Sequence, residues 1–506
     1  MSAPAAAPEP AFDFRMAVGL LGILLAAMMA GLNNRVPGLA LADLQGGLGL
    51  SRDAAAWLTT AYAAGEVATM PFSTWFAITL SLRRFHLMML AASLALSLFL
   101  PFVQDLSLLL ALRFLQGIVS GALIPILMMS ALRFLPLHSR LYGLALFALA
   151  ITFSPNVALW LAALCVDRLE DWRWVYWHVI PFGLAAAALV AWGIPKMPPL
   201  PARFREGNWF GMALGFPGLA LLVVGVDQGV RLDWLHSPLI VAALLVGFTF
   251  TALFLVSEWF HPAPFVKLQM LARKNLWLGF SLFIFLLTLF AAAVTLPANA
   301  LANLQGFRMA QSASLGLTVG LPQLVLGPCV AFLLYQKWVD ARHVFAVGLL
   351  CIAAACWLAS GVTGEWMTRQ FLWIEILHAA GQALAVVAYL FLCTAVVRPM
   401  EGGYVAGFVN ILRVFGVTIA SAFIGQFTAE RGRFHAEMLL DNAGTLLARL
   451  PAEDAGWSSL GSTIAREASI LATADIYRVL ALLALLMIPF VLKLQHFPAV
   501  QRTDDK

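Results

Sequence analysis

The chain has 506 residues, of which 62% are hydrophobic and only 11% are charged, and its formal net charge is +5. Its mean hydropathy is +0.88. An average soluble domain is about a quarter charged, so this composition excludes an ordinary soluble protein and indicates a polytopic membrane protein. The basic residues are spread over short connections rather than gathered on one face, which argues against nucleic-acid binding.

An Ala/Pro-rich segment at 1–15 comes first, and we expect a flexible tail there because no small-residue cleavage site of a signal peptide follows it. Apolar segments long enough to cross a bilayer as helices follow it. We expect fourteen spans, at 16–42, 55–80, 85–104, 107–132, 141–164, 174–194, 209–226, 238–257, 276–297, 312–335, 343–362, 371–397, 403–427 and 474–495. Most lysines and arginines of the connections lie on the side of the two termini, which predicts that both termini are cytoplasmic.

The first span contains the polar stretch LNNRVPG at 32–38. An arginine at the centre of a membrane helix costs roughly 2.5–3.5 kcal/mol, so Arg35 needs a compensating role. Asn33 and Asn34 precede it, and we expect all three to contact substrate. Pro37 lacks a backbone N–H and therefore frees the carbonyl of Asn33. A half-buried arginine reaching the lipid headgroups is the alternative.

The second span carries Glu66 in its middle. A carboxylate buried away from water takes up a proton readily, so Glu66 is the first candidate for proton coupling. A structural hydrogen bond or a salt bridge to Arg35 are the alternatives. Tyr62, one turn earlier, and Gln323 in a later span are candidate substrate contacts.

Glu375, His378 and Gln382 in IEILHAAGQAL are spaced to share one helix face. Such a face would suit a proton relay formed by Glu375 and His378, with Gln382 touching substrate. A polar patch at the outer membrane interface explains the same spacing equally well.

Five segments resemble a known family. They are WLTTAYAAGEVATMPFSTWFA (57–77), LALRFLQGIVSGALIP (110–125), DWRWVYWHVIPFG (171–183), DQGVRLDW (227–234) and NILRVFGVTIASA (410–422). They resemble the major facilitator superfamily, and within it the fourteen-span drug/proton antiporters of the EmrB/QacA type. The resemblance runs from about residue 16 to residue 495.

The resemblance implies an all-α fold of two six-helix bundles with two additional central helices, and substrate bound between the bundles near the membrane midplane. The bundles would occupy 16–194 and 276–495, and the additional helices 209–257. The second bundle would include a long periplasmic loop at 428–473, before a cytoplasmic tail at 496–506.

The family's R-x-x-Q-G motif falls on Arg113, Gln116 and Gly117, so the resemblance implies Arg113 in proton coupling and Gln116 at the substrate. A structural role for Arg113, holding backbone carbonyls together, is the alternative. Arg413 matches the family's R-x-x-G position and is a candidate substrate contact, with a structural role as its alternative. Arg83 and Arg84 remain from the family's gating loop.

Three departures from the family pattern stand out. The family's first-span acidic residue is replaced by Asn33, and the gating-loop Asp by Ile78. In the fifth span, SPNVALWLAAL (154–164) keeps Pro155 but lacks the glycines of the antiporter motif. A fixed cation at Arg35 without the neighbouring acid favours anionic substrates over the lipophilic cations exported by many relatives.

No Walker A motif, dinucleotide fingerprint, H-E-x-x-H sequence or paired cysteine motif is present, so we expect no enzyme, no metal and no cofactor beyond the proton gradient. The leading hypothesis is proton-coupled export of a small amphipathic compound, such as a drug, organic acid or siderophore, across a bacterial inner membrane. A proton-coupled uptake symporter or a non-transporting receptor are the alternatives. The resemblance to tripartite efflux pumps implies that the outer loop 434–470, with a predicted amphipathic helix before Pro451, docks a periplasmic adaptor and outer-membrane channel. A self-packed lid over the outer vestibule is the alternative.

Overall fold

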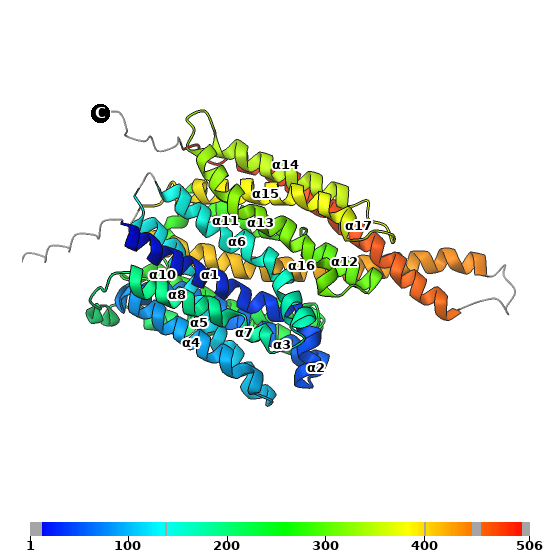
Figure 1. Ribbon diagram of the computed structural model, residues 1–506, viewed down its shortest axis with the longest axis horizontal. Helices are drawn as coiled ribbons and strands as arrows, with labels where there is room; N and C mark the ends of the chain where they lie inside the picture. The colour runs from blue at the N-terminus through cyan, green and yellow to red at the C-terminus, as the bar shows by residue number, and fades with distance from the viewer. Residues whose placement is uncertain (1–12, 137–138, 399–400, 448–456, 498–506) are drawn as a thin grey trace, which may run out of the picture.

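The computed structural model describes residues 13–136, 139–398, 401–447 and 457–497, and within these ranges the chain forms helices and no strand. The helices run roughly side by side, with most of those of the N-terminal half below and most of those of the C-terminal half above in Figure 1. This arrangement confirms the all-α membrane fold expected from the composition.

The N-terminal half contains α1 (Phe14–Leu39), α2 (Leu41–Leu48), α3 (Arg52–Thr79), α4 (Leu82–Phe99), η1 (Leu100–Phe102), α5 (Leu106–Phe134), α6 (Arg140–Ala163), η2 (Leu164–Arg168), α7 (Trp174–Trp177) and α8 (Val179–Gly193). Within it α1 packs against α5, α6 and α8, and α3 packs along α5. We call this group the N-terminal bundle.

The middle of the chain contains η3 (Pro201–Arg205), α9 (Trp209–Gly229), η4 (Trp234–His236), α10 (Pro238–Phe260) and η5 (Leu268–Ala272). These helices are central in the sequence but peripheral in space. α9 packs against α3 and α16, and α10 packs chiefly against α9.

The C-terminal half contains α11 (Lys274–Phe290), α12 (Thr295–Gln305), α13 (Met309–Leu334), α14 (Ala341–Ala359), α15 (Thr368–Thr394), α16 (Gly402–Leu447) and α17 (Trp457–Leu492). We call this group the C-terminal bundle. It meets the N-terminal bundle where α13 and α15 pack on α6 and where α16 packs on α3 and α5.

In the described part of the chain, thirteen helices are long and apolar enough to cross a membrane. α3 is not among them, although it lies against α5, α9 and α16. Its polar residues, Glu66 among them, lower its hydropathy. The count of fourteen spans, which includes α3, therefore stays a prediction, as does the side on which the termini lie.

Three segments differ from the expected boundaries. α1 ends at Leu39 rather than at 42, so Arg35 lies about one turn, roughly 6 Å, from its end. The expected span 276–297 is broken between α11 and α12. The expected loop 428–473 is largely helical, because α16 and α17 continue as a pair that projects beyond the other helices (Figure 1). The predicted helix before Pro451 is the end of α16, and residues 448–456 lie outside the described ranges.

Close contact between α3 and α5 fixes the position of Glu66. A Cβ atom added to Gly117 would lie 2.0 Å from the Tyr62 carbonyl oxygen, and one added to Gly121 would lie 2.3 Å from that of Glu66. Only glycine lets two helix backbones approach so closely. The small residues of GIVSG (117–121) therefore form a close contact between α3 and α5.

Candidate functional site

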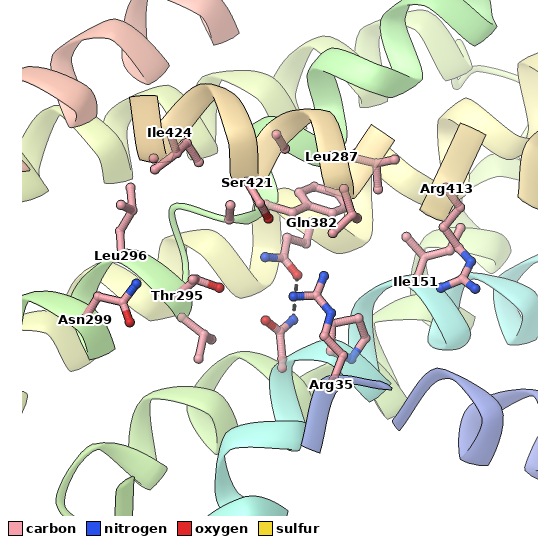
Figure 2. A pocket seen from close by; sticks show the side chains of 18 residues that line it. Arg35, Ile151, Leu287, Thr295, Leu296, Asn299, Gln382, Arg413, Ser421 and Ile424 are labelled. Atoms are coloured by element: carbon pink, nitrogen blue, oxygen red, sulfur yellow. Dashed lines mark hydrogen bonds between the residues drawn. The ribbon is translucent and has the colours of Figure 1, made fainter. Parts of the chain in front are cut away.

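A cavity of about 220 Å³ lies between the two bundles and is lined from α1, α6, α11, α12, α15 and α16. Its polar side chains are those of Arg35, Asn156, Thr295, Asn299, Gln382, Arg413 and Ser421. Ile151, Leu287, Leu296 and Ile424 supply apolar surface (Figure 2). The walls therefore offer both cationic and apolar contacts.

A second cavity, of about 240 Å³, shares Arg35, Thr295 and Arg413 with the first and adds Asn34, Glu66 and Asp227. Because they share lining residues, the two hollows adjoin, and we call them together the central cavity. It brings charged side chains from α1, α3, α9 and α16 to one place.

Arg35 lines both parts of the central cavity, and Figure 2 shows its side chain extending toward Gln382. Within the described part of the chain, its guanidinium makes no hydrogen bond or ion pair. Asn34 lines the cavity beside it, and its side-chain oxygen has no described partner. Arg35 is thus a cation within the protein whose hydrogen-bonding capacity is unused.

Glu66 on α3 pairs with Arg413 on α16, with 3.4 Å between Oε1 and Nη2. Both residues are buried, and the pair joins the two bundles. The alternative pairing of Glu66 with Arg35 is wrong for this conformation, because no ion pair joins those two described residues. Nε of Arg413 has no described partner, so this side chain also retains an unused donor.

Arg113 lies in a different environment, inside the N-terminal bundle. Its Nη1 donates to the side chain of Gln116 at 2.6 Å and to the Asn33 carbonyl at 3.4 Å. The carbonyl of Asn33 is the one that Pro37 was expected to free, so that prediction is confirmed. The guanidinium also lies 4.6 Å from the ring centroid of Tyr62.

The residues around Arg113 form hydrogen bonds with one another and with the backbone of the N-terminal bundle. Gln116 donates to the Asn33 side chain at 3.2 Å, and the Tyr62 hydroxyl donates to the Ala30 carbonyl at 3.0 Å. Asn33, Tyr62, Arg113 and Gln116 are fully buried, and none of them lines the central cavity in this conformation. Their predicted roles in substrate binding and proton coupling stay predictions.

An amide pair crosses between the bundles at the cavity wall. Asn156 on α6 donates from Nδ2 to Oε1 of Gln382 on α15, at 2.8 Å (Figure 2). α13 presses on the same point, since a Cβ added to Gly316 would lie 2.2 Å from the Asn156 carbonyl oxygen. Gln323 lies outside the lining and donates to the Ala379 carbonyl at 2.8 Å.

Glu375 and His378 are buried in α15, with exposures of 1% and 0%. Neither lines the central cavity, and neither ring nitrogen of His378 has a described partner. Both side chains therefore face the protein interior, and the alternative of a polar patch at the outer membrane interface is not decided by their burial. A relay role for this pair stays a prediction.

The broken helix between α11 and α12 borders the cavity. Ala291 and Val294 in the break, and Thr295, Leu296 and Asn299 in the first turns of α12, all line it. The N-terminus of a helix carries a partial positive charge, and interrupted helices at the midplane often serve ion or substrate sites. This position adds to the positive character of the cavity.

Several lining residues were not predicted. Asp227 accepts a hydrogen bond from Thr60 and brings α9 to the cavity. Its signal in the sequence was a carboxylate within the apolar stretch 209–229, in the segment DQGVRLDW used only for the resemblance. Thr295, Asn299 and Ser421 gave no signal, because single small polar residues are ordinary in membrane helices.

The predicted gating arginines lie at the start of α4, within the N-terminal bundle. Arg83 donates to the Ile194 carbonyl at 3.3 Å, and Arg84 is exposed. Ser81, in the turn before α4, adopts a φ of 77°. The turn therefore keeps a backbone conformation that favours glycine. The described residues contain no cluster of His, Cys, Asp and Glu able to hold a metal.

Comparison with known proteins gives a match to the family model described as Major Facilitator Superfamily over residues 23–421. The multidrug export protein EmrB of Escherichia coli K12 is 23% identical over 68% of this chain and 67% of its own length. The fatty acid resistance protein FarB of Neisseria gonorrhoeae is 22% identical over 93% of this chain and 94% of its own length. The colistin resistance protein EmrB of Acinetobacter baumannii is 23% identical over 79% and 77%.

Solved structures share the fold. The human organic anion transporter MFSD10 aligns with a TM-score of 0.58 and 14% identity, covering 94% of this chain and 99% of that chain. The proton:xylose symporter XylE aligns with a TM-score of 0.52 and 13% identity, covering 96% and 97%. These two structures support the helical architecture of the chain.

Proposed function

The chain belongs to the major facilitator superfamily and is a transporter rather than an enzyme, and from that premise we propose that it exports a small amphipathic anion in exchange for protons. Its relatives include multidrug export proteins, which supports the outward direction. The membrane would be a bacterial inner membrane, as for relatives of this type.

The observation that carries the anionic substrate is the unpaired guanidinium of Arg35 in the central cavity. Glu66 pairs with Arg413, and the other carboxylate of the lining, Asp227, accepts a hydrogen bond from Thr60, so neither acid forms an ion pair with Arg35. A guanidinium binds a carboxylate through two parallel hydrogen bonds, and this contact strengthens away from water. The apolar walls from Leu287 and Ile424 would hold a hydrocarbon portion.

The relative named for fatty acid resistance fits this substrate class, since a fatty acid joins a carboxylate to an apolar chain. We therefore take dodecanoate as the probe and tetraphenylphosphonium as its cationic counterpart. Arg35→Ala should weaken dodecanoate binding to purified protein. Arg35→Lys should retain part of the affinity, because lysine keeps the positive charge but lacks the two parallel N–H donors of a guanidinium. Tight tetraphenylphosphonium binding, unchanged in both variants, would overturn the anion proposal.

Proton coupling is assigned to Glu66, because its partner Arg413 belongs to the other bundle. Protonation removes the negative charge of Glu66 and with it the attraction between α3 and α16. The bundles can then rearrange, which is the requirement for alternating access. Imposed pH gradients in inside-out vesicles test this step: substrate uptake should collapse when a protonophore is added.

One observation favours a second candidate, proton–anion cotransport. Glu66 and an incoming anion would share Arg413. Protonation of Glu66 raises the summed charge of Arg35, Arg413 and Glu66 from +1 to +2. Proton and anion then favour each other's binding, which suits a symporter. Proteoliposomes loaded with dodecanoate distinguish exchange from cotransport. As dodecanoate leaves, exchange brings protons into the lumen and acidifies it, whereas cotransport carries protons out and makes the lumen more alkaline.

The projecting ends of α16 and α17 are the proposed contact for a periplasmic adaptor of a tripartite pump. Phe434, Met438 and Leu440 are each about half exposed there, at 46%, 48% and 54%. Deleting 440–460 should abolish adaptor pull-down while dodecanoate binding by the bundles persists. Unchanged pull-down by the deletion variant would contradict the docking proposal.

A further inference from the structure

A separate cavity of about 430 Å³ lies at the C-terminal end of α3. Its lining includes Trp75 and Ile78 of α3, Arg133 of α5, Arg140 at the start of α6, Arg203 of η3 and Tyr404 of α16. It is therefore built from both bundles and from the segment that joins them. We call it the basal cavity.

The basal cavity is distant from the central cavity. Ile78 lies twelve residues beyond Glu66 on the same helix, which is about 18 Å at 1.5 Å per residue. Between them α16 packs on α3, where a Cβ added to Gly407 would lie 3.9 Å from the Cα atom of Pro71. The two cavities are thus separate sites in this conformation.

Three guanidiniums from three elements face the basal cavity, and no carboxylate lines it among the described residues. Arg140 donates from Nε to the Leu135 carbonyl at 3.2 Å, while Arg133 and Arg203 make no hydrogen bond or ion pair in the described part. Arg203 instead lies 5.5 Å from the ring centroid of Trp75. Three positive charges therefore meet without a counter-charge.

The buried carboxylates of the flanking elements are already occupied. Glu258 of α10 accepts from Asn208 and from the Val266 backbone, both at 2.8 Å. Glu401 pairs with Arg273 at 2.7 Å. Ile78, which replaces the gating-loop Asp of the family pattern, lines the basal cavity and supplies no negative charge to its three arginines.

The rest of the wall is apolar. Trp75 and Phe265 form an aromatic surface, with ring centroids 5.1 Å apart, and Met129 lies in the lining with Ile78. A ligand with an anionic head and a hydrocarbon portion would match both parts of this wall. A phosphate-sized inorganic ion would leave the aromatic surface unused.

We propose that the basal cavity is a loading site for amphipathic carboxylates, from which substrate passes to the central cavity when the bundles rearrange. The site deepens the proposed function and rests on it for the direction of transfer. Binding at the basal cavity itself requires only the three guanidiniums and the aromatic wall.

Quenching of tryptophan fluorescence by bromododecanoate, with the protein in zwitterionic lipid nanodiscs, reports on this site because Trp75 lines it. The chain has 16 tryptophans, so the signal from Trp75 is the difference between the wild type and Trp75→Phe. Arg133→Gln, Arg140→Gln and Arg203→Gln should each weaken that quenching about tenfold, as expected when one charged hydrogen bond is lost. Arg205→Gln is the matched control, since Arg205 is exposed in the same η3 and does not line the cavity.

A second substitution pair tests charge without removing an arginine. Ile78→Asp adds a carboxylate among the guanidiniums and should abolish the Trp75 quenching, whereas the similarly sized Ile78→Asn should preserve it. Equal affinity in all the arginine variants, or equal loss in Arg205→Gln, would overturn the proposal. Quenching of Trp75 by brominated phosphatidylglycerol but not by bromododecanoate would also overturn it, because the site would then hold lipid.

Arg35→Ala separates this proposal from the proposed function. Trp75 quenching should persist in that variant, even though transport is lost. Wild-type transport that is independent of anions, together with Trp75 quenching that still depends on Arg133 and Arg203, would refute the proposed export of anions. The basal cavity would then remain a binding site for carboxylates.

Discussion

Arg113 and Arg35 both interrupt apolar helices of the N-terminal bundle, but their surroundings differ. Arg113 is fully buried and is held by Gln116, by two backbone carbonyls and by the ring of Tyr62. Arg35 lines the central cavity and has no described partner. A buried arginine can thus either stabilise a bundle or await a ligand, and its partners distinguish the two roles.

The largest effect is expected from Arg113→Ala, because it leaves Gln116 and two carbonyls without their donor. We expect a loss of about 2–4 kcal/mol in the free energy of unfolding, visible as a lower Tm of the purified protein. Arg35→Ala is the matched comparison, since Arg35 faces the cavity and has no described partner. Similar Tm losses in the two variants would remove the distinction drawn here.

Glu66→Gln should abolish proton-driven transport while expression and dodecanoate binding remain. Glutamine keeps the shape of the side chain but cannot exchange a proton, so the contact with Arg413 no longer responds to pH. The measurement is dodecanoate transport in vesicles against an imposed pH gradient. Wild-type transport with its usual pH dependence in this variant would eliminate Glu66 as the coupling group.

The helices and the family could be predicted because they depend on long apolar segments and on short motifs, which a sequence displays directly. The partner of Glu66 could not, because Arg413 follows it by 347 residues and reaches it only when the bundles meet. The break at 291–294 was also missed, because this stretch is as apolar as the helices beside it.

The sequence also did not show which polar side chains face the cavity and which face the interior of a bundle. Asn33 and Arg35 are only two residues apart, yet Asn33 faces the interior of the bundle and Arg35 faces the cavity. Side chains two apart on a helix point in different directions, so the density of polar residues in LNNRVPG predicted a site without saying which side chain belongs to it. Asn34 and Arg35 line the cavity, and their contact with substrate stays a prediction.

A smaller effect is expected from Arg35. Arg35→Ala should weaken dodecanoate binding about tenfold, equivalent to about 1.4 kcal/mol, and leave Tm nearly unchanged because no described contact is lost. The readout is equilibrium binding to purified protein alongside thermal unfolding. A large drop in Tm would place Arg35 with Arg113 among the structural arginines.

Arg273 provides a reference for an arginine satisfied by an acid. It binds both carboxylate oxygens of Glu401, at 2.7 and 3.0 Å, and these hydrogen bonds hold the pKa of Glu401 below its usual range. A lowered pKa stabilises the fold above the unfolded value and loses that effect as the pH falls through the folded value. Glu401→Gln should therefore cost about 0.5–1 kcal/mol at pH 7 and nothing once the pH is well below 4. A pH-independent difference in Tm would exclude the ion pair as its cause.

The smallest change in stability is expected from Asn33→Asp, which restores the acid that the family carries in its first span. The Asn33 side chain already lies in the Arg113 network, and its Nδ2 has no described partner. Aspartate has the same shape, replaces that unsatisfied donor with an acceptor and gives Arg113 a carboxylate. The gain in attraction is opposed by the desolvation of a new charge, so we expect the free energy of unfolding to change by less than about 1 kcal/mol. Ligand binding is the sharper readout. Because the introduced carboxylate would face Gln116 inside the bundle and not the cavity, dodecanoate affinity should stay within about twofold of the wild type, against the roughly tenfold loss expected for Arg35→Ala. A loss from Asn33→Asp as large as that from Arg35→Ala would show that the two regions act as one electrostatic site.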